Sequence, residues 1–343
     1  MQQPLKGQVA LVAGATRGAG RGIAIELAAA GAKVYCTGRS TRGHAATPGR
    51  PETIDETAQM IAAAGGAAVA VQVDHSVERE VEALAARVRA DDGRLDVLVN
   101  DIWGGDDLMR WSHKFWQLDI AQARAVLDQA MMTHLITARY LAPLMVEARR
   151  GLIVEVTDGE MPGYRGQLLF DLVKASVNRL AYGMAWDLVG TGVTALAISP
   201  GFLRSEAMLE RFGVTEANWR EGAKKDPAFI FSETPRYVGR AIAALAADPD
   251  VGAKAGLALF ADDLAPVYGF TDVDGSQPHF WKSIERWLEG ELAKPAVSDG
   301  ARFIAQTRYG HIHPLPARAE QARRYREALG LTGLGEGLRP FGG

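Results

Sequence analysis

The start of the chain holds a strand pattern, a glycine-rich turn and a helix pattern in that order, and this combination strongly limits the fold. An apolar run over residues 8–13 predicts a strand, and an apolar helical pattern covers 22–30. Between them lie Gly14, Gly18 and Gly20, spaced Gly-x-x-x-Gly-x-Gly. A chain that turns this tightly from strand to helix needs residues without a Cβ atom. The order is typical of the start of a βαβ unit.

Short apolar runs continue to alternate with helical stretches along the chain. We expect further strands at 33–37, 68–73, 95–99, 152–156 and 193–198. Helical patterns cover 53–64, 77–90, 121–149 and 170–189. Strands that are apolar on both faces and alternate with helices predict a parallel sheet with helices on both faces. Because crossovers are right-handed, the pattern predicts a doubly wound α/β fold of the Rossmann type.

Charge and composition exclude several classes of partner. A net charge of −3 and a pI near 6.2 give no basic field that would favour nucleic acid or acidic lipid. No apolar window is long enough to span a bilayer, and glycines interrupt the short apolar run at the N-terminus. The single cysteine, Cys36, cannot form an internal disulfide, which is typical of a reducing compartment. We therefore expect a cytoplasmic protein with no nucleic-acid partner and no membrane partner.

The glycine turn also predicts a ligand. Its backbone can approach a pyrophosphate closely, and the amides that open the following helix point toward such an anion. We therefore predict a dinucleotide site. Its first residues are Gly14, Thr16, Arg17, Gly18 and Gly20.

The end of the second predicted strand indicates the type of dinucleotide. NAD-type sites place an acidic residue there to bind the ribose 2′-hydroxyl, whereas NADP-type sites place an arginine to meet a 2′-phosphate. Here Arg39 and Ser40 follow Gly38, with no acid, and Arg17 lies inside the glycine turn. We predict NADP(H) rather than NAD(H), with Arg17 and Arg39 as phosphate partners. The alternative is that both are solvated surface arginines.

Several of these motifs resemble the short-chain dehydrogenase/reductase family, over residues 5–275. Asp74 matches the family's adenine-contacting aspartate, and Asn100 matches the first asparagine of its Asn-Asn-Ala-Gly motif. The sequence departs from the family directly after Asn100. There Trp103 places a bulky indole near the cofactor, where the family usually has small residues.

The resemblance continues toward the C-terminus. Pro200, Gly201 and Ser205 match a family segment whose hydroxyl contacts the nicotinamide amide. The stretch 268–275 resembles the member 1 subgroup of the family. The resemblance therefore implies one Rossmann domain over 1–275.

The family also implies a catalytic group, and this chain lacks one member of it. In the family a serine is followed thirteen residues later by a tyrosine, and four residues after that by a lysine. Thr157, Phe170 and Lys174 stand at these spacings. The tyrosine acts as acid or base, the serine donates a hydrogen bond, and the lysine lowers the tyrosine pKa and holds the ribose. Phenylalanine has no proton to give, and losing a general acid lowers a rate about 10²- to 10⁴-fold.

Three explanations of Phe170 stay open. It is an engineered Tyr→Phe change, or a natural loss that leaves a weak enzyme or a nucleotide-binding regulator, or another group has replaced it. Tyr164, Asp158 and Glu160 lie in the same segment as possible replacements. Gln129 stands near the place where the family often has an asparagine.

The predicted function is that of an NADP(H)-dependent oxidoreductase acting on a carbonyl or alcohol. Aromatic residues are frequent after the fourth strand and in the substrate segment, 202–233, which indicates a large apolar or aromatic substrate. We expect Trp103, Tyr164 and Phe202 to line its pocket. The alternative is a non-redox regulator or a lyase-like homologue.

The sequence also bears on oligomeric assembly, metal binding and the C-terminal tail. The family resemblance implies a homodimer or homotetramer through the helices 121–149 and 170–189. No metal site is expected, because His311 and His313 have no carboxylate nearby in the sequence. The C-terminal extension, 276–343, holds one helical pattern and ends in glycine-rich sequence. It is either partly disordered, or it docks over the active site or a neighbouring subunit.

Overall fold

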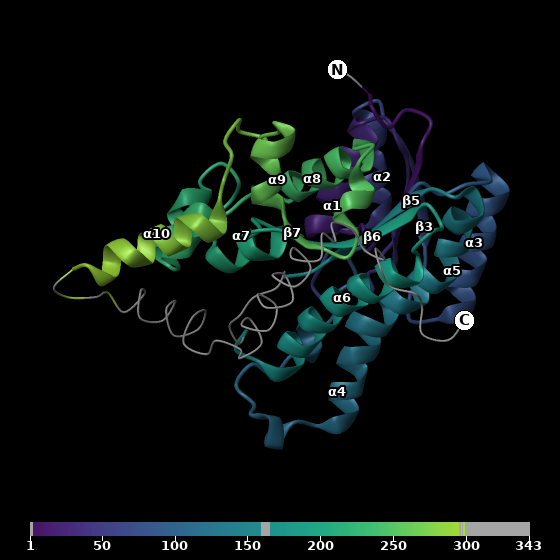
Figure 1. Ribbon diagram of the computed structural model, residues 1–343. Helices are drawn as coiled ribbons and strands as arrows, with labels where there is room; N and C mark the ends of the chain where they lie inside the picture. Colours follow the sequence, from purple (N-terminus) through teal and green to yellow (C-terminus); the bar gives the residue numbers. More distant parts are fainter. Residues whose placement is uncertain (1–2, 159–164, 295, 297, 299–343) are drawn as a thin grey trace, which may run out of the picture.

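A parallel sheet of seven strands forms the centre of the computed structural model, which describes residues 3–158, 165–294, 296 and 298 (Figure 1). The strands are β1 Val9–Ala13, β2 Lys33–Gly38, β3 Ala67–Gln72, β4 Val97–Asn100, β5 Gly151–Val156, β6 Val193–Ser199 and β7 Ala258–Phe260. Their order is β3-β2-β1-β4-β5-β6-β7, and all six neighbouring pairs are parallel. The direction of the order reverses between β1 and β4, so a crevice opens at the carboxyl ends of these two strands.

Helices cover both faces of the sheet, as predicted. They are α1 Gly18–Ala29, α2 Ile54–Ala63, α3 Glu78–Asp92, α4 Ile120–Leu127, α5 Thr133–Ala148, α6 Leu168–Asp187, α7 Glu206–Phe212, α8 Pro235–Ala247, α9 Ala261–Tyr268 and α10 Phe280–Leu292. Buried residues of α1, α2, α8 and α9 pack on one face, and those of α3, α5 and α6 pack on the other (Figure 1). The doubly wound fold is confirmed.

The strand β1 shows why the sequence pattern gives this arrangement. Ala10 and Val12 point into the core on the α1 face, whereas Val9, Leu11 and Ala13 point into the core on the α5 face. Successive side chains alternate between faces in a strand, so a strand covered on both sides must be apolar throughout.

The long helix predicted over 121–149 is divided in the structure. A π-helical turn, Asp128–Met132, separates α4 from α5. The turn brings the side chain of Gln129 toward Arg39, at the edge of the crevice. Single π turns inside α-helices are frequent at functional sites.

The substrate segment 202–233 folds over the crevice end of β6 around its own small core. Phe212, Trp219 and Phe229 are buried there, and Phe202 packs against Phe212 and Phe229. On its other side Ala228 packs with Phe280 of α10. The first helix of the predicted C-terminal extension therefore contacts this segment, whereas residues 299–343 lie outside the described part.

Within the described part of the chain, none of the helices is both long and apolar enough to span a bilayer.

Candidate nucleotide and catalytic site

The glycine turn between β1 and α1 lies directly against the end of β4. Gly14 has a φ of +93°, and a Cβ atom there would lie 2.3 Å from the carbonyl oxygen of Asp101. A Cβ atom on Gly20 would lie 2.3 Å from the carbonyl oxygen of Gly14. Both distances are far below any possible contact with fixed backbone, so only glycine fits at these two positions. The turn thereby brings the first amides of α1 to the crevice.

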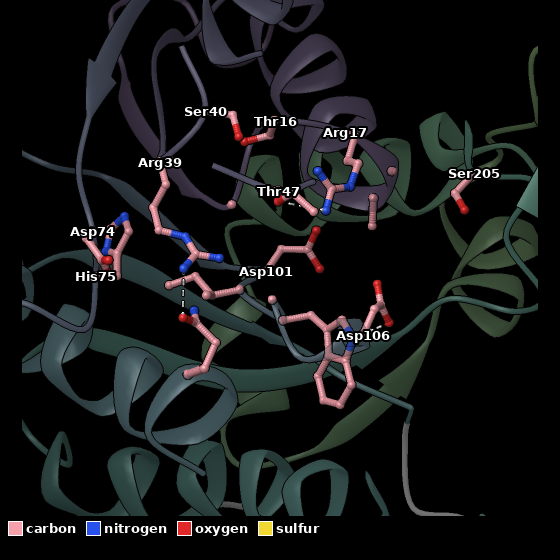
Figure 2. A pocket seen from close by; sticks show the side chains of 18 of the residues that line it. Thr16, Arg17, Arg39, Ser40, Thr47, Asp74, His75, Asp101, Asp106 and Ser205 are labelled. Carbon is pink, nitrogen blue, oxygen red and sulfur yellow. Dashed lines mark hydrogen bonds between the residues drawn. The ribbon is translucent and has the colours of Figure 1, made fainter. Parts of the chain in front are cut away.

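One pocket occupies the crevice, and most of the predicted cofactor residues line it (Figure 2). They are Gly14, Thr16, Arg17, Gly18, Arg39, Asp74, Lys174 and Ser205. Trp103, predicted to contact the substrate, lines the same pocket. Gly20 packs against the backbone of Gly14 and is not among the pocket residues. The segments that follow β1, β2, β4 and β6 and the helix α6 therefore meet at one place.

The two predicted phosphate-binding arginines approach the pocket from different sides, with Asp101 between them in Figure 2. Arg39 follows the last residue of β2 and donates a hydrogen bond of 3.0 Å from Nη1 to Oε1 of Gln129. Arg17 reaches the hydroxyl of Thr47, with 3.5 Å from Nη2 to Oγ1. Neither hydrogen bond involves a carboxylate, so both guanidinium groups keep their charge available to an anion.

Asp74 and Asn100 have different surroundings. Asp74 lines the pocket, and its Oδ1 accepts hydrogen bonds from the amide and hydroxyl of Ser76, at 3.0 and 2.6 Å. Asn100 is fully buried and is not among the pocket residues. Its Nδ2 donates to Oε1 of Glu155 at 2.7 Å, which ties β4 to β5 below the crevice.

Pro200 and Gly201 are not among the residues that line the pocket. A Cβ atom on Gly201 would lie 2.7 Å from both Oε2 of Glu233 and Cβ of Phe280. This close packing leads the chain from β6 toward Ser205, which does line the pocket. Phe202 belongs to the core of the substrate segment, with ring centroids 5.3 Å from Phe229.

A buried ion pair supports the end of β4 from below. Nδ1 of His134 lies 2.5 Å from Oε2 of Glu155, and its Nε2 lies 2.8 Å from the carbonyl oxygen of Ile102. Burial opposes protonation, but the neighbouring Glu155 carboxylate raises the pKa of His134 above its ordinary value. The pair fixes the backbone between Asn100 and Trp103, and with it the position of the indole.

Asp101 places a titratable group inside the pocket itself. Burial raises the pKa of its carboxyl to about 7, although Lys174, His134 and the amide of Gly20 act in the opposite direction. The group is therefore divided between its neutral and ionised forms near neutral pH.

The ring of Phe170 belongs to an aromatic cluster. Its centroid lies 5.3 Å from that of Trp103, edge to face, and 5.2 Å from that of Trp111. The ammonium of Lys174 lies 5.1 Å from the Trp103 centroid and 5.5 Å from the Phe170 centroid. The lysine therefore sits between the cofactor pocket and two aromatic faces, an arrangement that favours a cation.

Thr157 completes the predicted catalytic group. It is buried, and its hydroxyl donates a hydrogen bond of 3.0 Å to the carbonyl oxygen of Lys174, which joins the end of β5 to α6. Tyr164 and Glu160 lie outside the described residues. Asp158 lies 3.9 Å from Nε of Arg165, so it is engaged in an ion pair.

Comparison with known proteins identifies the family. Residues 8–213 match the family model described as short chain dehydrogenase. The chain is a short-chain dehydrogenase/reductase. It is 36% identical over 280 residues to mouse (Mus musculus) "Dehydrogenase/reductase SDR family member 1", covering 80% of this chain and 86% of the relative. The human (Homo sapiens) protein of that name is 35% identical over 285 residues, with the same coverage. The predicted resemblance to the member 1 subgroup is confirmed.

Solved structures agree with this family. A metagenomic short-chain oxidoreductase in complex with NADP has a TM-score of 0.55 and 25% identity, covering 72% of this chain and 94% of its own. A hydroxysteroid dehydrogenase from Escherichia coli has a TM-score of 0.59, covering 75% and 95%. Its 24% identity supports the fold alone.

A nicotinamide dinucleotide fits the pocket of this short-chain dehydrogenase/reductase. Its family binds such cofactors, and the absence of Cβ atoms at Gly14 and Gly20 allows the tight turn that brings the start of α1 to the pocket, where a diphosphate would bind. Arg39 and Asp74 lie at one side of the pocket in Figure 2, and Ser205 lies at the opposite side. The adenosine half would bind at the first side and the nicotinamide half at the second.

The sequence did not indicate several residues that line the pocket of this short-chain dehydrogenase/reductase. They include Thr47, His75 and Asp101. Asp101 could have been found, because an acid directly after Asn100 departs from the family's motif. Thr47 could not, because the connection between β2 and α2 has no pattern that reveals its path.

Proposed function

We propose that this chain is an NADP(H)-dependent oxidoreductase that acts on a carbonyl or alcohol of an apolar or aromatic small molecule. The observation that carries the cofactor preference is the pair of arginines in the pocket. Arg39 follows β2 where an NAD-type site would have an acid, and Arg17 lies in the glycine turn. A 2′-phosphate between them would replace the neutral partners Gln129 and Thr47 with a charge-assisted bond.

Each protein group has a part in the proposed reaction. The bound nicotinamide would supply or accept the hydride. The Lys174 ammonium would hold the adjacent ribose, and the hydroxyl of Ser205 would orient the nicotinamide amide. The ring of Phe170 would fill the place of the family's acid without donating a proton. Trp103 and Trp111 around it would bind the apolar part of the substrate.

The proposal therefore includes slow proton transfer. Phe170 and Lys174 lie on one face of α6, so a hydroxyl added to the ring would join the group formed by Thr157 and Lys174. The test measures NADPH oxidation by this chain and by Phe170→Tyr across a panel of aromatic and aliphatic carbonyl compounds. We expect the variant to be faster by about 10²- to 10⁴-fold. Equal rates in both proteins would contradict the assignment of position 170.

A second candidate function has one observation in its favour. Among the described residues, the Phe170 ring contacts Trp103, Trp111 and the Lys174 ammonium, and it packs against a cluster of buried aliphatic side chains. A regulator that binds the dinucleotide without redox chemistry would need no acid there. NADPH binding without turnover, in this chain and in Phe170→Tyr alike, would favour this candidate.

We also infer a homodimer or homotetramer in the cytoplasm. Exposed apolar side chains on α4, α5 and α6 support the assembly, and they are Ile120, Leu135, Val146, Leu168 and Leu172. The buried free thiol of Cys36 is consistent with a reducing compartment. Light scattering coupled to gel filtration tests the assembly, since a monomer at micromolar concentration would contradict it.

A further inference from the structure

The amides at the start of α1 are partly engaged within the protein. The amide of Gly18 donates a hydrogen bond of 2.8 Å to Oε2 of Glu206, and that of Gly20 is bonded to the Asp101 carboxylate. The amide of Arg21 reaches the carbonyl oxygen of Arg17 at 3.3 Å. The Ala19 amide has no acceptor within the described part of the chain, and Ala19 lines the pocket. It is therefore the amide most open to a diphosphate.

Glu206 comes from a distant part of the chain. It is the first residue of α7, 188 positions after Gly18. Its Oε1 also lies 3.5 Å from Nη1 of Arg21. The side chain thus behaves as an internal anion, held at a helix N-terminus and beside a guanidinium as an external anion would be.

A second contact holds α7 against the same site. Glu210 lies one helical turn after Glu206, and its Oε2 lies 2.5 Å from Nη1 of Arg50, in the connection between β2 and α2. Residues four apart share one face of a helix. One face of α7 therefore contacts both the glycine turn and the β2–α2 connection. Since α7 opens with Ser205 at its N-cap and ends at Phe212, it joins the pocket wall to the core of the substrate segment.

We propose that Glu206 is a positioning residue through which cofactor binding moves the substrate segment 202–233. Without the dinucleotide, its carboxylate holds α7 on the Gly18 amide. The diphosphate, bound at the neighbouring Ala19 amide, displaces this carboxylate, so that α7 loses its contact with the glycine turn while Ser205 at its N-cap stays in the pocket wall. The inference rests on the proposed function, because it requires a dinucleotide in the pocket.

Charge balance gives the physical reason. Amides of adjacent residues in one helical turn would hold a diphosphate and the Glu206 carboxylate a few ångströms apart, where like charges repel. Arg21 cannot neutralise both, because its Nη2 already lies 2.5 Å from Oε2 of Glu56 and donates to the carbonyl oxygen of Thr16. The free protein therefore pairs Glu206 with the amide, and the bound protein favours its departure. A contact broken on binding weakens the apparent affinity, so removing the charge should strengthen it.

The experiment compares Glu206→Gln with the unchanged chain and with Glu221→Gln as the matched control. Both variants remove one negative charge from the substrate segment and keep the side-chain length, but only the first changes the partner of the Gly18 amide, since Glu221 pairs with Lys224 at the surface. Calorimetric titration with NADPH should show binding about two- to ten-fold tighter in Glu206→Gln, and this gain should shrink at high salt. Glu221→Gln should stay within about two-fold of the unchanged chain.

Hydrogen exchange of the α7 amides reports whether α7 is held against the glycine turn. NADPH should speed exchange across α7 in the unchanged chain, and Glu206→Gln should exchange fast before the cofactor is added. Equal or weaker NADPH binding in Glu206→Gln would overturn this inference, and so would slower α7 exchange when NADPH binds to the unchanged chain. Neither result would contradict the proposed function. If none of the three proteins binds NADPH, the proposed function fails together with it.

Discussion

The Lys174 ammonium lies 5.5 Å from the centroid of the Phe170 ring, one turn along the same face of α6. In the short-chain dehydrogenase/reductase family this spacing joins a lysine to a tyrosine. Here Lys174 lines the pocket, while the phenylalanine beside it has no proton to transfer. Variants at these two positions can therefore test binding and proton transfer one at a time.

The gain from Phe170→Tyr should depend on Lys174. A phenol near an ammonium ionises more readily, because the positive charge favours phenolate over its ordinary pKa near 10. We expect Phe170→Tyr to raise kcat and to introduce a new ionisation in the pH–rate profile below that value. In Phe170→Tyr combined with Lys174→Met, most of the gain should disappear. A double variant as fast as Phe170→Tyr alone would show that the two side chains do not cooperate.

Arg39 should decide between the two dinucleotides. Arg39→Asp removes a partner of the 2′-phosphate and adds an acceptor for a 2′-hydroxyl, so NADPH binding should weaken by about ten- to a hundred-fold while NADH binding improves. Fluorescence titration with each nucleotide measures the ratio. Arg42→Asp is the control, since Arg42 contacts Gln59 outside the pocket. If Arg42→Asp changes the ratio of NADPH to NADH affinity as much as Arg39→Asp does, the effect comes from the change in net charge and not from a contact with the 2′-phosphate.

Asp101 should make nucleotide binding dependent on pH. Burial raises the pKa of its carboxyl to about 7, so the group is mostly neutral below that pH and ionised above it. An ionised carboxylate in the pocket repels the diphosphate, and NADPH binding should weaken as pH rises through about 7. The dissociation constant, measured between about pH 5.5 and 8.5, should change less in Asp101→Asn. Parallel profiles in the two proteins would contradict this role.

The Asp101 carboxyl should also make the stability of the folded protein depend on pH. In the unfolded chain the Asp101 carboxyl has its ordinary pKa near 3.8, and in the folded protein burial raises this pKa to about 7. The folded state therefore holds a proton that the unfolded state releases, so stability falls as pH rises between these two values. Thermal melting of the free protein isolates this loss when the unchanged chain is compared with Asp101→Asn: the melting temperature of the unchanged chain should fall relative to that of the variant as pH rises between these two values. A difference that stays constant, or that rises in favour of the unchanged chain, would contradict the assignment.

The glycine turn should tolerate no added methyl group. In Gly20→Ala the new Cβ would meet the carbonyl oxygen of Gly14 at 2.3 Å, and fixed backbone cannot yield. We expect a loss of about 2 kcal/mol or more in stability together with loss of NADPH binding. Gly183→Ala on α6 is the control, because nothing lies within 4 Å of its added Cβ. It should be neutral or stabilise the helix by up to about 1 kcal/mol.

Much of the fold followed from local patterns. Strands buried on both faces had to be apolar throughout, and β1 is. The glycine turn was predictable because tight backbone approach excludes every other residue at Gly14 and Gly20. These features are set by a few neighbouring residues, so a single sequence reveals them.

The hydrogen bonds within the site that join residues far apart in the sequence could not be predicted. Arg39 meets Gln129 across 90 positions, and Gly18 meets Glu206 across 188. Such pairs depend on where each crossover connection brings the chain back to the sheet. The hydrophobic periodicity of the sequence predicts single helices and strands but does not show which distant residues meet. Glu155 could have been noticed, since an acid inside a fully buried strand requires a partner. The identity of that partner, His134, needed the structure.

The most direct test of the account is a calorimetric titration of the unchanged chain with NADPH, with NADH as the comparison. We predict saturable binding of one NADPH per chain, at least about ten-fold tighter than NADH, because only NADPH brings a phosphate to Arg17 and Arg39. Absence of saturation with NADPH, or equal affinity for both nucleotides, would contradict it.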